Sequence, residues 1–255
     1  MKKIIKYVML DILKNRIVLG YTFFLFLIAV SFFNLEDNSS KGLLGLLNIV
    51  LIIVPLISII FSTIYIYNSN EFLELLVCQP IKRVTLLSSV YTGLLASLVI
   101  SVFIGIGVPV LIYEPTLTGF ILVIVAIILT AVFVSLALLG SVLIRDKAKG
   151  IGMSILLWFY FAIIFDGIIL FLLFQFQDYP LEKTSIVLTM LNPIDMGRIM
   201  VLLQMDVAAM MGYTGAVFKM FFGSTAGIAA IAIVMSGWIL LPAYWAIRKF
   251  NRKDL

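Results

Sequence analysis

The sequence predicts an all-α integral membrane protein with six transmembrane helices. Hydrophobic residues make up 63% of its 255 residues and charged residues only 12%, whereas soluble domains carry about 45–50% apolar and about 25% charged residues. The mean hydropathy of +1.21 agrees with this composition. A spanning helix needs about 20 largely apolar residues. We expect a single domain over residues 1–255 with spans at 17–33, 43–67, 84–113, 118–144, 150–176 and 223–247.

Residues 1–16 are basic and amphipathic. Their apolar side chains fall on one helical face and most of their lysines lie off it, as in KKIIKYVMLDILKNR. This pattern predicts an N-terminal interfacial helix that lies on the membrane before the first span. A cleaved signal peptide is the alternative. It is less favoured, because no A-x-A-like cleavage site follows the apolar run at SFFNLEDNSS.

The distribution of basic residues predicts the orientation. With six spans both termini lie on the same side of the membrane, and that side receives all but four of the 18 Lys and Arg residues. The exceptions are Lys41, Lys183, Arg198 and Lys219. Because positive charge marks the cytoplasmic side, we expect both termini in the cytoplasm. The pI near 9.3 then reflects charge facing anionic lipid, and no nucleic-acid partner is expected.

Several chemistries are excluded by what the sequence lacks. Histidine is absent and Cys78 is the single cysteine, so Ser–His–Asp catalysis, histidine-ligated zinc, Cys/His metal clusters and an internal disulfide are ruled out. No G-x-x-x-x-G-K-[S/T] motif occurs. We therefore expect no enzyme activity, no metal site and no cofactor on this chain itself.

Residues 70–83 form a short amphipathic segment between the second and third spans. Phe72, Leu75 and Leu76 make an apolar face with two glutamates beside it, and Pro80 then ends the helix. A soluble partner could bind such a helix and push on the spans at both of its ends. An ordinary loop helix resting on the membrane is the alternative that periodicity alone leaves open.

This segment resembles a known family. The pattern E-L-L-x-x-Q-P-x-x-R at residues 74–83, directly after a second span, resembles the coupling helix of permeases of the type 2 ABC exporter class. The Gln-Pro form and the compact six-span subunit are similar to the NosY-like branch. A second similar segment, L-N-P-x-D-x-x-R at 191–198, lies before the last span. The chain departs from the class at Glu71-Phe72, where Gly-Thr is frequent, and at Ser88-Ser89, where a basic residue is common.

The resemblance implies a homodimeric permease whose subunits each bind a separate cytoplasmic ATPase subunit that carries ATP and Mg. It places the ATPase contact at Glu71, Phe72, Glu74, Leu75, Leu76, Gln79, Pro80 and Arg83. It also implies a periplasmic β-helical NosD-like partner, with docking expected at Asn192, Pro193, Asp195 and Arg198. Such NosDFY-type complexes serve copper-site assembly of nitrous oxide reductase, and the resemblance implies that the chain lies in the bacterial inner (cytoplasmic) membrane.

Three other functions stay open at this point. The first is export of a lipid, drug or glycan, which would need a polar lining. The second span offers few candidates for one: Asn48, Ser58, Ser62, Thr63 and Asn68. The second is a membrane scaffold without an ATP-driven cycle. The third is a membrane enzyme, which the missing histidines and paired acids disfavour.

Asp166 is the only acid deep inside a predicted span. A charge at the bilayer centre costs about 2.5–3.5 kcal/mol on insertion scales, so its side chain should face a bundle interior or cavity. A gating or proton-linked role is one interpretation. The other is a hydrogen-bonded residue at a dimer interface or in the outer leaflet. A single acid also disfavours an aspartyl protease, whose chemistry needs two.

Residues 177–222 are predicted to form a helical external segment whose short helices do not span. Pro193 should start a helix, with Asp195 close to its positive end. Seven of the 11 methionines lie between 190 and 220. Thioethers suit Cu(I), but partner docking or lipid contact is the favoured interpretation of these methionines.

Small residues recur every four positions in the third span, at Gly93, Ser97, Ser101 and Gly105. Such spacing lets helix backbones approach closely. We expect packing within one bundle, with a subunit interface as the alternative.

Overall fold

The computed structural model describes residues 2–36, 39–69, 83–176, 182–205 and 225–251, and every regular element in those ranges is helical. Six helical stretches are long and apolar enough to cross a membrane. The predicted all-α fold with six spans is therefore confirmed. Their bounds are Arg16–Leu35, Lys41–Asn68, Arg83–Tyr113, Leu117–Leu143, Lys147–Leu172 and Gly227–Asn251.

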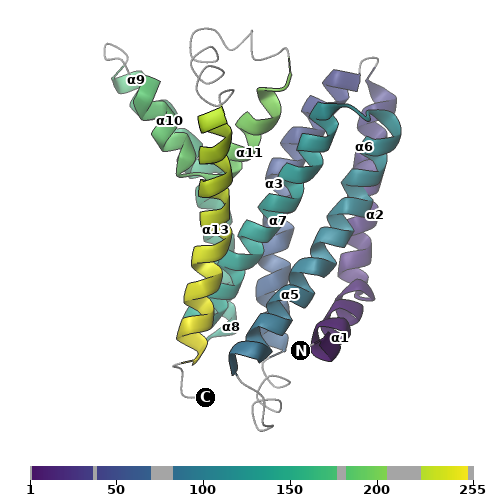
Figure 1. Ribbon diagram of the computed structural model, residues 1–255, viewed down its shortest axis with the longest axis vertical. Helices are drawn as coiled ribbons and strands as arrows, with labels where there is room; N and C mark the ends of the chain where they lie inside the picture. The colour runs from purple at the N-terminus through teal and green to yellow at the C-terminus, as the bar shows by residue number, and fades with distance from the viewer. Residues whose placement is uncertain (1, 37–38, 70–82, 177–181, 206–224, 252–255) are drawn as a thin grey trace.

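The spans pack side by side into one bundle (Figure 1). They are built from α2 (Arg16–Leu35), α3 (Ser39–Asn68), α5 with η1 and α6 (Arg83–Tyr113), α7 (Leu117–Leu143), α8 with η2 and α9 (Lys147–Gln175), and α13 (Thr225–Asn251). Figure 1 shows α1 (Lys2–Leu13) and the C-terminal end of α13 at one end of the bundle. The short helices α10 (Glu182–Met190) and α11 (Pro193–Leu202) lie at the other end.

Helix α7 is the centre of the bundle. Its sequence carries no charged residue, and 78% of its most apolar window is buried inside the chain. A helix that is apolar on all sides is one that neighbours surround. Here the neighbours are α3, α5, α11 and α13. Helix α7 contributes more buried residues to the larger hydrophobic core than any other helix, among them Leu122, Leu129 and Phe133.

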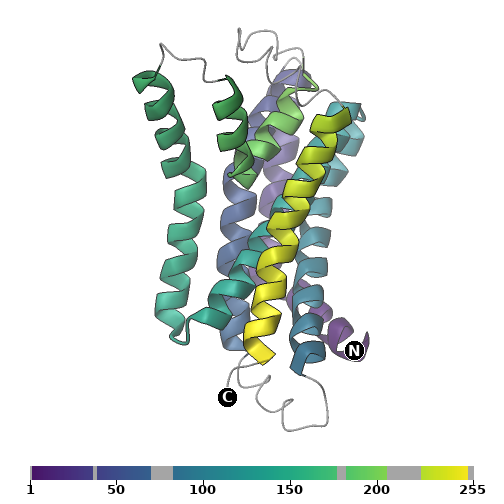
Figure 2. The same cartoon turned by 60° about the vertical axis from the view of Figure 1, so that its left-hand side comes forward.

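The fifth span differs, because only 11% of its most apolar window is buried. It consists of α8 (Lys147–Phe159), a π-helical turn η2 (Tyr160–Ile164) and α9 (Phe165–Gln175). Figure 2 shows α9 standing at the edge of the bundle. A second π-helical turn, η1 (Phe103–Gly107), interrupts the third span. Such turns break the regular hydrogen-bond ladder and are frequent at functional sites.

The small-residue stripe of the third span packs against helices of the same chain. A Cβ atom at Gly93 would lie 2.8 Å from Cγ1 of Val8 in α1, and one at Gly105 would lie 2.7 Å from Cβ of Leu25 in α2. The hydroxyl of Ser97 donates to the carbonyl oxygen of Met9 at 3.3 Å. For these positions the expectation of packing within the bundle is confirmed.

Helix α1 is helical as predicted, with Val8 and Ile12 buried on its apolar face. The hydroxyl of Tyr65 in α3 donates to the carboxylate of Asp11 at 3.1 Å. The position of α1 at the membrane surface stays a prediction. The helical character of the predicted external segment is confirmed for 182–202, and the rest of 177–222 lies outside the described residues.

Candidate functional site

The predicted helix start at Pro193 is confirmed. Asn192 is the N-cap of α11: its Oδ1 accepts a hydrogen bond from the backbone N–H of Ile194 at 3.0 Å, and Pro193 occupies the first helical position. Proline suits this position because its missing N–H would have no partner in the helix. Asp195 follows in the first turn, where a negative charge complements the helix dipole.

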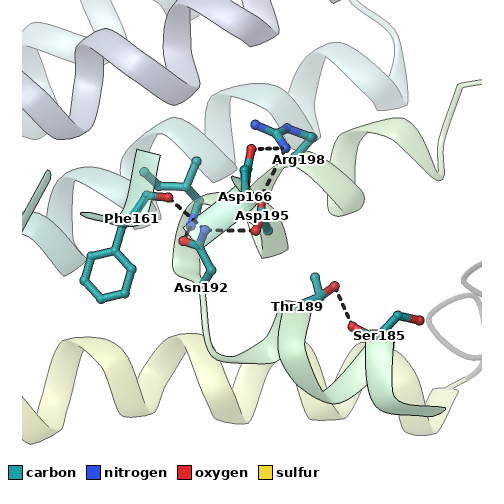
Figure 3. Close-up of polar contacts among 8 residues, drawn as sticks. Phe161, Asp166, Ser185, Thr189, Asn192, Asp195 and Arg198 are labelled. Atoms are coloured by element: carbon teal, nitrogen blue, oxygen red, sulfur yellow. Dashed lines mark hydrogen bonds and ion pairs between the residues drawn. The ribbon is translucent and has the colours of Figure 1, made fainter. Parts of the chain in front are cut away.

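The amide nitrogen of Asn192 joins α11 to the fifth span. Its Nδ2 donates to the backbone carbonyl oxygen of Phe161 at 2.9 Å and to Oδ2 of Asp195 at 2.8 Å (Figure 3). Phe161 belongs to the π-helical turn η2. The Asn192 side chain is fully buried, and both of its amide hydrogens and its oxygen have partners. No other side chain of similar size supplies one acceptor and two donors in this arrangement.

Asp166 has a charged partner. Nη1 of Arg198 donates to Oδ2 of Asp166 in α9 and to Oδ1 of Asp195 in α11, both at 3.0 Å (Figure 3). One guanidinium nitrogen thus binds carboxylates from two helices. The side chains of Arg198, Asp166 and Asp195 are 36%, 30% and 9% exposed. The sequence predicted that Asp166 needs a polar environment, but it did not identify Arg198 as the partner.

The charges of this cluster do not balance. Two carboxylates share one guanidinium, and Asp195 lies among buried neighbours. Burial raises the pKa of the Asp195 carboxyl from 3.8 to about 7, and the nearby Asp166 carboxylate acts in the same direction. Arg198 and the hydrogen bond from Asn192 partly oppose that rise in pKa. The cluster can therefore exchange a proton near neutral pH.

Gly197 lets α11 pack closely against α7. A Cβ atom there would lie 2.8 Å from Cγ1 of Val125 in α7. Met196 and Met205 are also buried, being 1% and 7% exposed. For these two methionines the expectation of lipid contact or partner docking is wrong, because both side chains belong to the hydrophobic core of the chain. Met210, Met211 and Met220 lie outside the described residues.

The four residues expected to dock a partner differ in exposure. Asn192, Pro193 and Asp195 are buried, and the polar atoms of Asn192 and Asp195 bind groups of the same chain. Arg198 keeps an exposed fraction. Docking of a partner at this helix stays a prediction. Of the four residues, Arg198 is the one whose side chain is partly exposed.

A second group of contacts joins α8 to α3 at the end of the bundle that holds α1. The hydroxyl of Tyr67 donates to the carbonyl oxygen of Ile144 at 2.8 Å, and its ring lies against Gly150 with no room for a Cβ atom. Nζ of Lys147 donates to Oδ1 of Asn68 at 2.7 Å. No sequence motif marked Tyr67 or Gly150. The signal that the sequence offered was Gly150, a small residue at the first position of the predicted span 150–176.

These contacts lie at the C-terminal end of α3, next to the predicted coupling segment. The seven residues from Glu71 to Pro80 that were assigned to ATPase binding lie outside the described residues, and Arg83 is the first residue of α5. The described residues therefore include α3 and α5, the two helices that flank the segment. Asn68, the last residue of α3, connects directly to it.

The polar residues of the second span do not form a continuous lining within this chain. Ser58, Ser62 and Thr63 are fully buried, whereas Asn48 is exposed. The hydroxyl of Thr63 shares a hydrogen bond of 2.7 Å with that of Ser154 in α8. Among the described side chains, the hydroxyls of Ser58 and Ser62 are buried without a hydrogen-bond partner.

Two comparisons place this architecture among known proteins. A model of the ABC-2 family of transporter proteins matches residues 3–255. A protein of Pseudomonas aeruginosa described as "Probable ABC transporter permease protein NosY" is 26% identical over 220 residues, which cover 78% of this chain and 80% of that protein. The predicted similarity to NosY-like permeases of this class is confirmed.

Proposed function

Because this chain belongs to the ABC-2 family of transporter proteins, we propose that it is the membrane subunit of an ATP-driven complex that transmits work to the far side of the membrane. The observation that carries the proposal is the family match over nearly the whole chain, together with the similarity to a NosY permease. A permease of this type lies in a bilayer and works with a separate ATPase. We further propose that two copies of the chain form the permease.

The proposed ATPase contact is the segment 70–83, bound in a groove of the ATPase subunit. Support comes from the ends of α3 and α5 that flank it, which lie at the α1 end of the bundle (Figure 1). Most described basic residues gather at that same end, among them Lys14, Arg16, Arg83, Arg145, Lys147, Lys149, Arg248 and Lys249. An excess of positive charge favours the cytoplasmic side. We therefore propose that this end is cytoplasmic.

Transmission to the opposite side is proposed to run through the fifth span. Its lower part, α8, is joined to α3 by the Lys147–Asn68 and Ser154–Thr63 hydrogen bonds. Its upper part is joined to α11 by the Asp166–Arg198 ion pair. Only 11% of the most apolar window of this span is buried, so its upper part can move about the buried turn η2 without breaking the core. This arrangement supports a mechanical role over passage of a substrate through one subunit.

On the biological role, we propose that the complex assists copper-site assembly of nitrous oxide reductase with a periplasmic NosD-like protein. The support is the similarity to a NosY permease and the helical segment formed by α10 and α11. Export of a lipid, drug or glycan is the alternative. It predicts ATP-driven movement of such a substrate in liposomes, whereas the proposed role predicts copper-deficient nitrous oxide reductase in cells without the permease.

The test of ATPase coupling uses substitutions in the segment 70–83. Glu74→Arg and Leu75→Asp should abolish co-purification of the co-expressed ATPase subunit, because small helix-in-groove contacts depend on a few apolar anchors and a matched charge. Glu36→Arg is the matched control, since Glu36 is an exposed acid at the C-cap of α2, outside this segment.

Size-exclusion profiles and thermal unfolding midpoints show whether each variant is folded. The proposal requires that the first two variants lose the ATPase while remaining folded and that the control retains it. Assembly and ATPase stimulation retained in both Glu74→Arg and Leu75→Asp would contradict the assignment of this segment.

A further inference from the structure

The upper part of the fifth span is attached to the rest of the chain by few groups. Helix α9 contacts mainly η2 below it and α10 beside it. Its apolar side chains are largely exposed, with Leu170, Phe171 and Phe174 at 65%, 66% and 81%. The specific polar attachment of α9 among the described residues is the Asp166–Arg198 ion pair. This pair is the natural point at which the position of α9 could be controlled.

The part of the span below η2 is held firmly. Trp158 of α8 donates to the carbonyl oxygen of Ile52 in α3 at 3.1 Å, and Ser154 is bonded to Thr63 of the same helix. Phe161 of η2 is buried, with its ring edge-to-face against Phe133 and Trp238 at centroid distances of 6.3 and 5.4 Å. Movement of α9 would therefore pivot at η2, where the π-helical turn already interrupts the regular helix.

The attachment is sensitive to charge. Arg198 neutralises one of the two carboxylates that it binds, so the ionised cluster has an excess negative charge. Two carboxylates that face each other in a partly buried site repel, and one bound proton removes the repulsion. Asp166 moves with α9 whereas Asp195 is fixed in α11, so this repulsion acts between the two helices.

We propose that Asp166, Asp195 and Arg198 form a proton-binding latch between α9 and α11. With a proton on Asp195 the cluster is neutral and α9 is held against α11. Loss of that proton weakens the attachment, and α9 tilts away about η2. The latch is a property of this chain alone, so it does not depend on the ATPase or on a periplasmic partner.

Within the described residues, α11 packs against five other elements: α7, α10, α3, α13 and η2. Helix α7 carries no ionisable group. The remaining elements that contact α11 carry Tyr160 in η2, Glu182 and Lys183 in α10, Lys41, Tyr65 and Tyr67 in α3, and Tyr244, Arg248 and Lys249 in α13. The charges that act on Asp195 are those of Asp166 and Arg198. The latch is therefore assigned to these three side chains.

The direction of the pH effect follows from the pKa of Asp195, which rises from 3.8 to about 7 in the folded chain. A carboxyl with a raised pKa binds its proton more tightly when folded, so the native arrangement loses stability as pH rises from about 4 to about 7. Above that range the loss is complete. The latch is expected to be closed at pH 5.5 and weakened at pH 8.5.

The experiment measures the position of α9 in the purified chain in lipid nanodiscs by double electron–electron resonance. Cys78→Ser removes the native thiol, and spin labels are placed through Phe174→Cys in α9 and Ile228→Cys in α13, both at exposed positions. The 11 residues of α9 form a lever of about 16 Å, so each 10° of tilt moves its end by about 3 Å. A second pair, Met153→Cys with Leu240→Cys, reports on α8 below the pivot.

The expected result is a Phe174–Ile228 label distance that changes between pH 5.5 and 8.5 with a midpoint near 7, while the Met153–Leu240 distance stays constant. Asp195→Asn should hold the distance at its acid value throughout, because the amide mimics the protonated acid. Asp11→Asn, which alters a carboxylate in α1, should titrate like the unmodified chain.

Two results would overturn the latch: an unmodified chain whose label distance is the same at both pH values, or an Asp195→Asn chain that titrates normally. If Asp195→Asn fails to fold, Asp166→Asn decides. It leaves one carboxylate for one guanidinium, so the transition near pH 7 should disappear. Persistence of that transition in Asp166→Asn would equally reject the proposal.

Discussion

The side-chain amide of Asn192 donates a 2.9 Å hydrogen bond to the backbone carbonyl oxygen of Phe161, inside the π-helical turn of the fifth span. A π-helical turn interrupts the regular i→i−4 hydrogen-bond ladder, and a further donor to one of its carbonyl oxygens strengthens it. Asn192 supplies this donor from the N-cap position of α11. The irregular turn and the helix cap therefore stabilise each other.

Asn192→Ala should destabilise the chain more than an exposed asparagine does. The substitution removes the hydrogen bonds of Asn192 to the Phe161 carbonyl, the Ile194 N–H and the Asp195 carboxylate, and a buried polar group left unsatisfied costs about 1–3 kcal/mol. Thermal unfolding in detergent measures the effect, with Asn48→Ala at an exposed position of α3 as the control. Equal unfolding midpoints for the two variants would show that the Asn192 bonds contribute little.

Arg198→Gln should be more harmful than Asp166→Asn. The first variant leaves two carboxylates facing each other, whereas the second leaves one carboxylate paired with one guanidinium. The loss of stability in Arg198→Gln should be larger at pH 8 than at pH 5.5, because acid protonates one of the carboxyls. Unfolding midpoints at both pH values test this. Lys147→Gln, a cation at the other end of the span, should show no such pH difference.

Gly93→Ala should loosen α1. The added Cβ would lie 2.8 Å from Cγ1 of Val8 and 3.2 Å from the carbonyl oxygen of Ile5, and overpacking of this kind costs about 1–3 kcal/mol. Hydrogen–deuterium exchange in residues 2–13 should accelerate by at least about fivefold. Gly140→Ala, where no atom lies within 4 Å of the new Cβ, should leave that exchange unchanged. Unaltered protection in Gly93→Ala would refute the packing argument.

Gly150→Ala should disturb the junction of α3 with α8. A Cβ atom there would overlap the ring of Tyr67, so the Tyr67 hydroxyl must leave the carbonyl oxygen of Ile144. Gly152→Ala, two positions along the same helix, meets open space and is the control. In the complex with its ATPase, we expect Gly150→Ala to lower ATPase stimulation and Gly152→Ala to preserve it. Equal stimulation in both would remove this junction from the proposed path.

Joint replacement of Met196, Met200 and Met205 by leucine should change little. Met196 and Met205 are buried among apolar neighbours, and a swap of similar volume usually costs less than about 1.5 kcal/mol. Thermal unfolding and the copper content of the purified chain are the measurements. Loss of bound copper in a variant of normal stability would instead identify the thioethers as ligands.

The sequence by itself determined the six spans and the helix start at Pro193, and it marked Asp166 as a residue that needs a polar environment. These features depend on local properties: the apolar length that crosses a bilayer, the geometry of proline, and the cost of a charge in lipid. Each can be evaluated within one segment, without knowledge of its neighbours.

Only the tertiary structure decided which groups meet. Arg198 lies 32 positions after Asp166, and Tyr67 lies 77 positions before Ile144. The burial of Met196 likewise depends on its packing with Ile186 of α10 and with Ile231 and Met235 of α13. No periodic pattern encodes such pairs, because they arise from the rotation and tilt at which helices pack, and those are set jointly by the side chains of all the helices in contact.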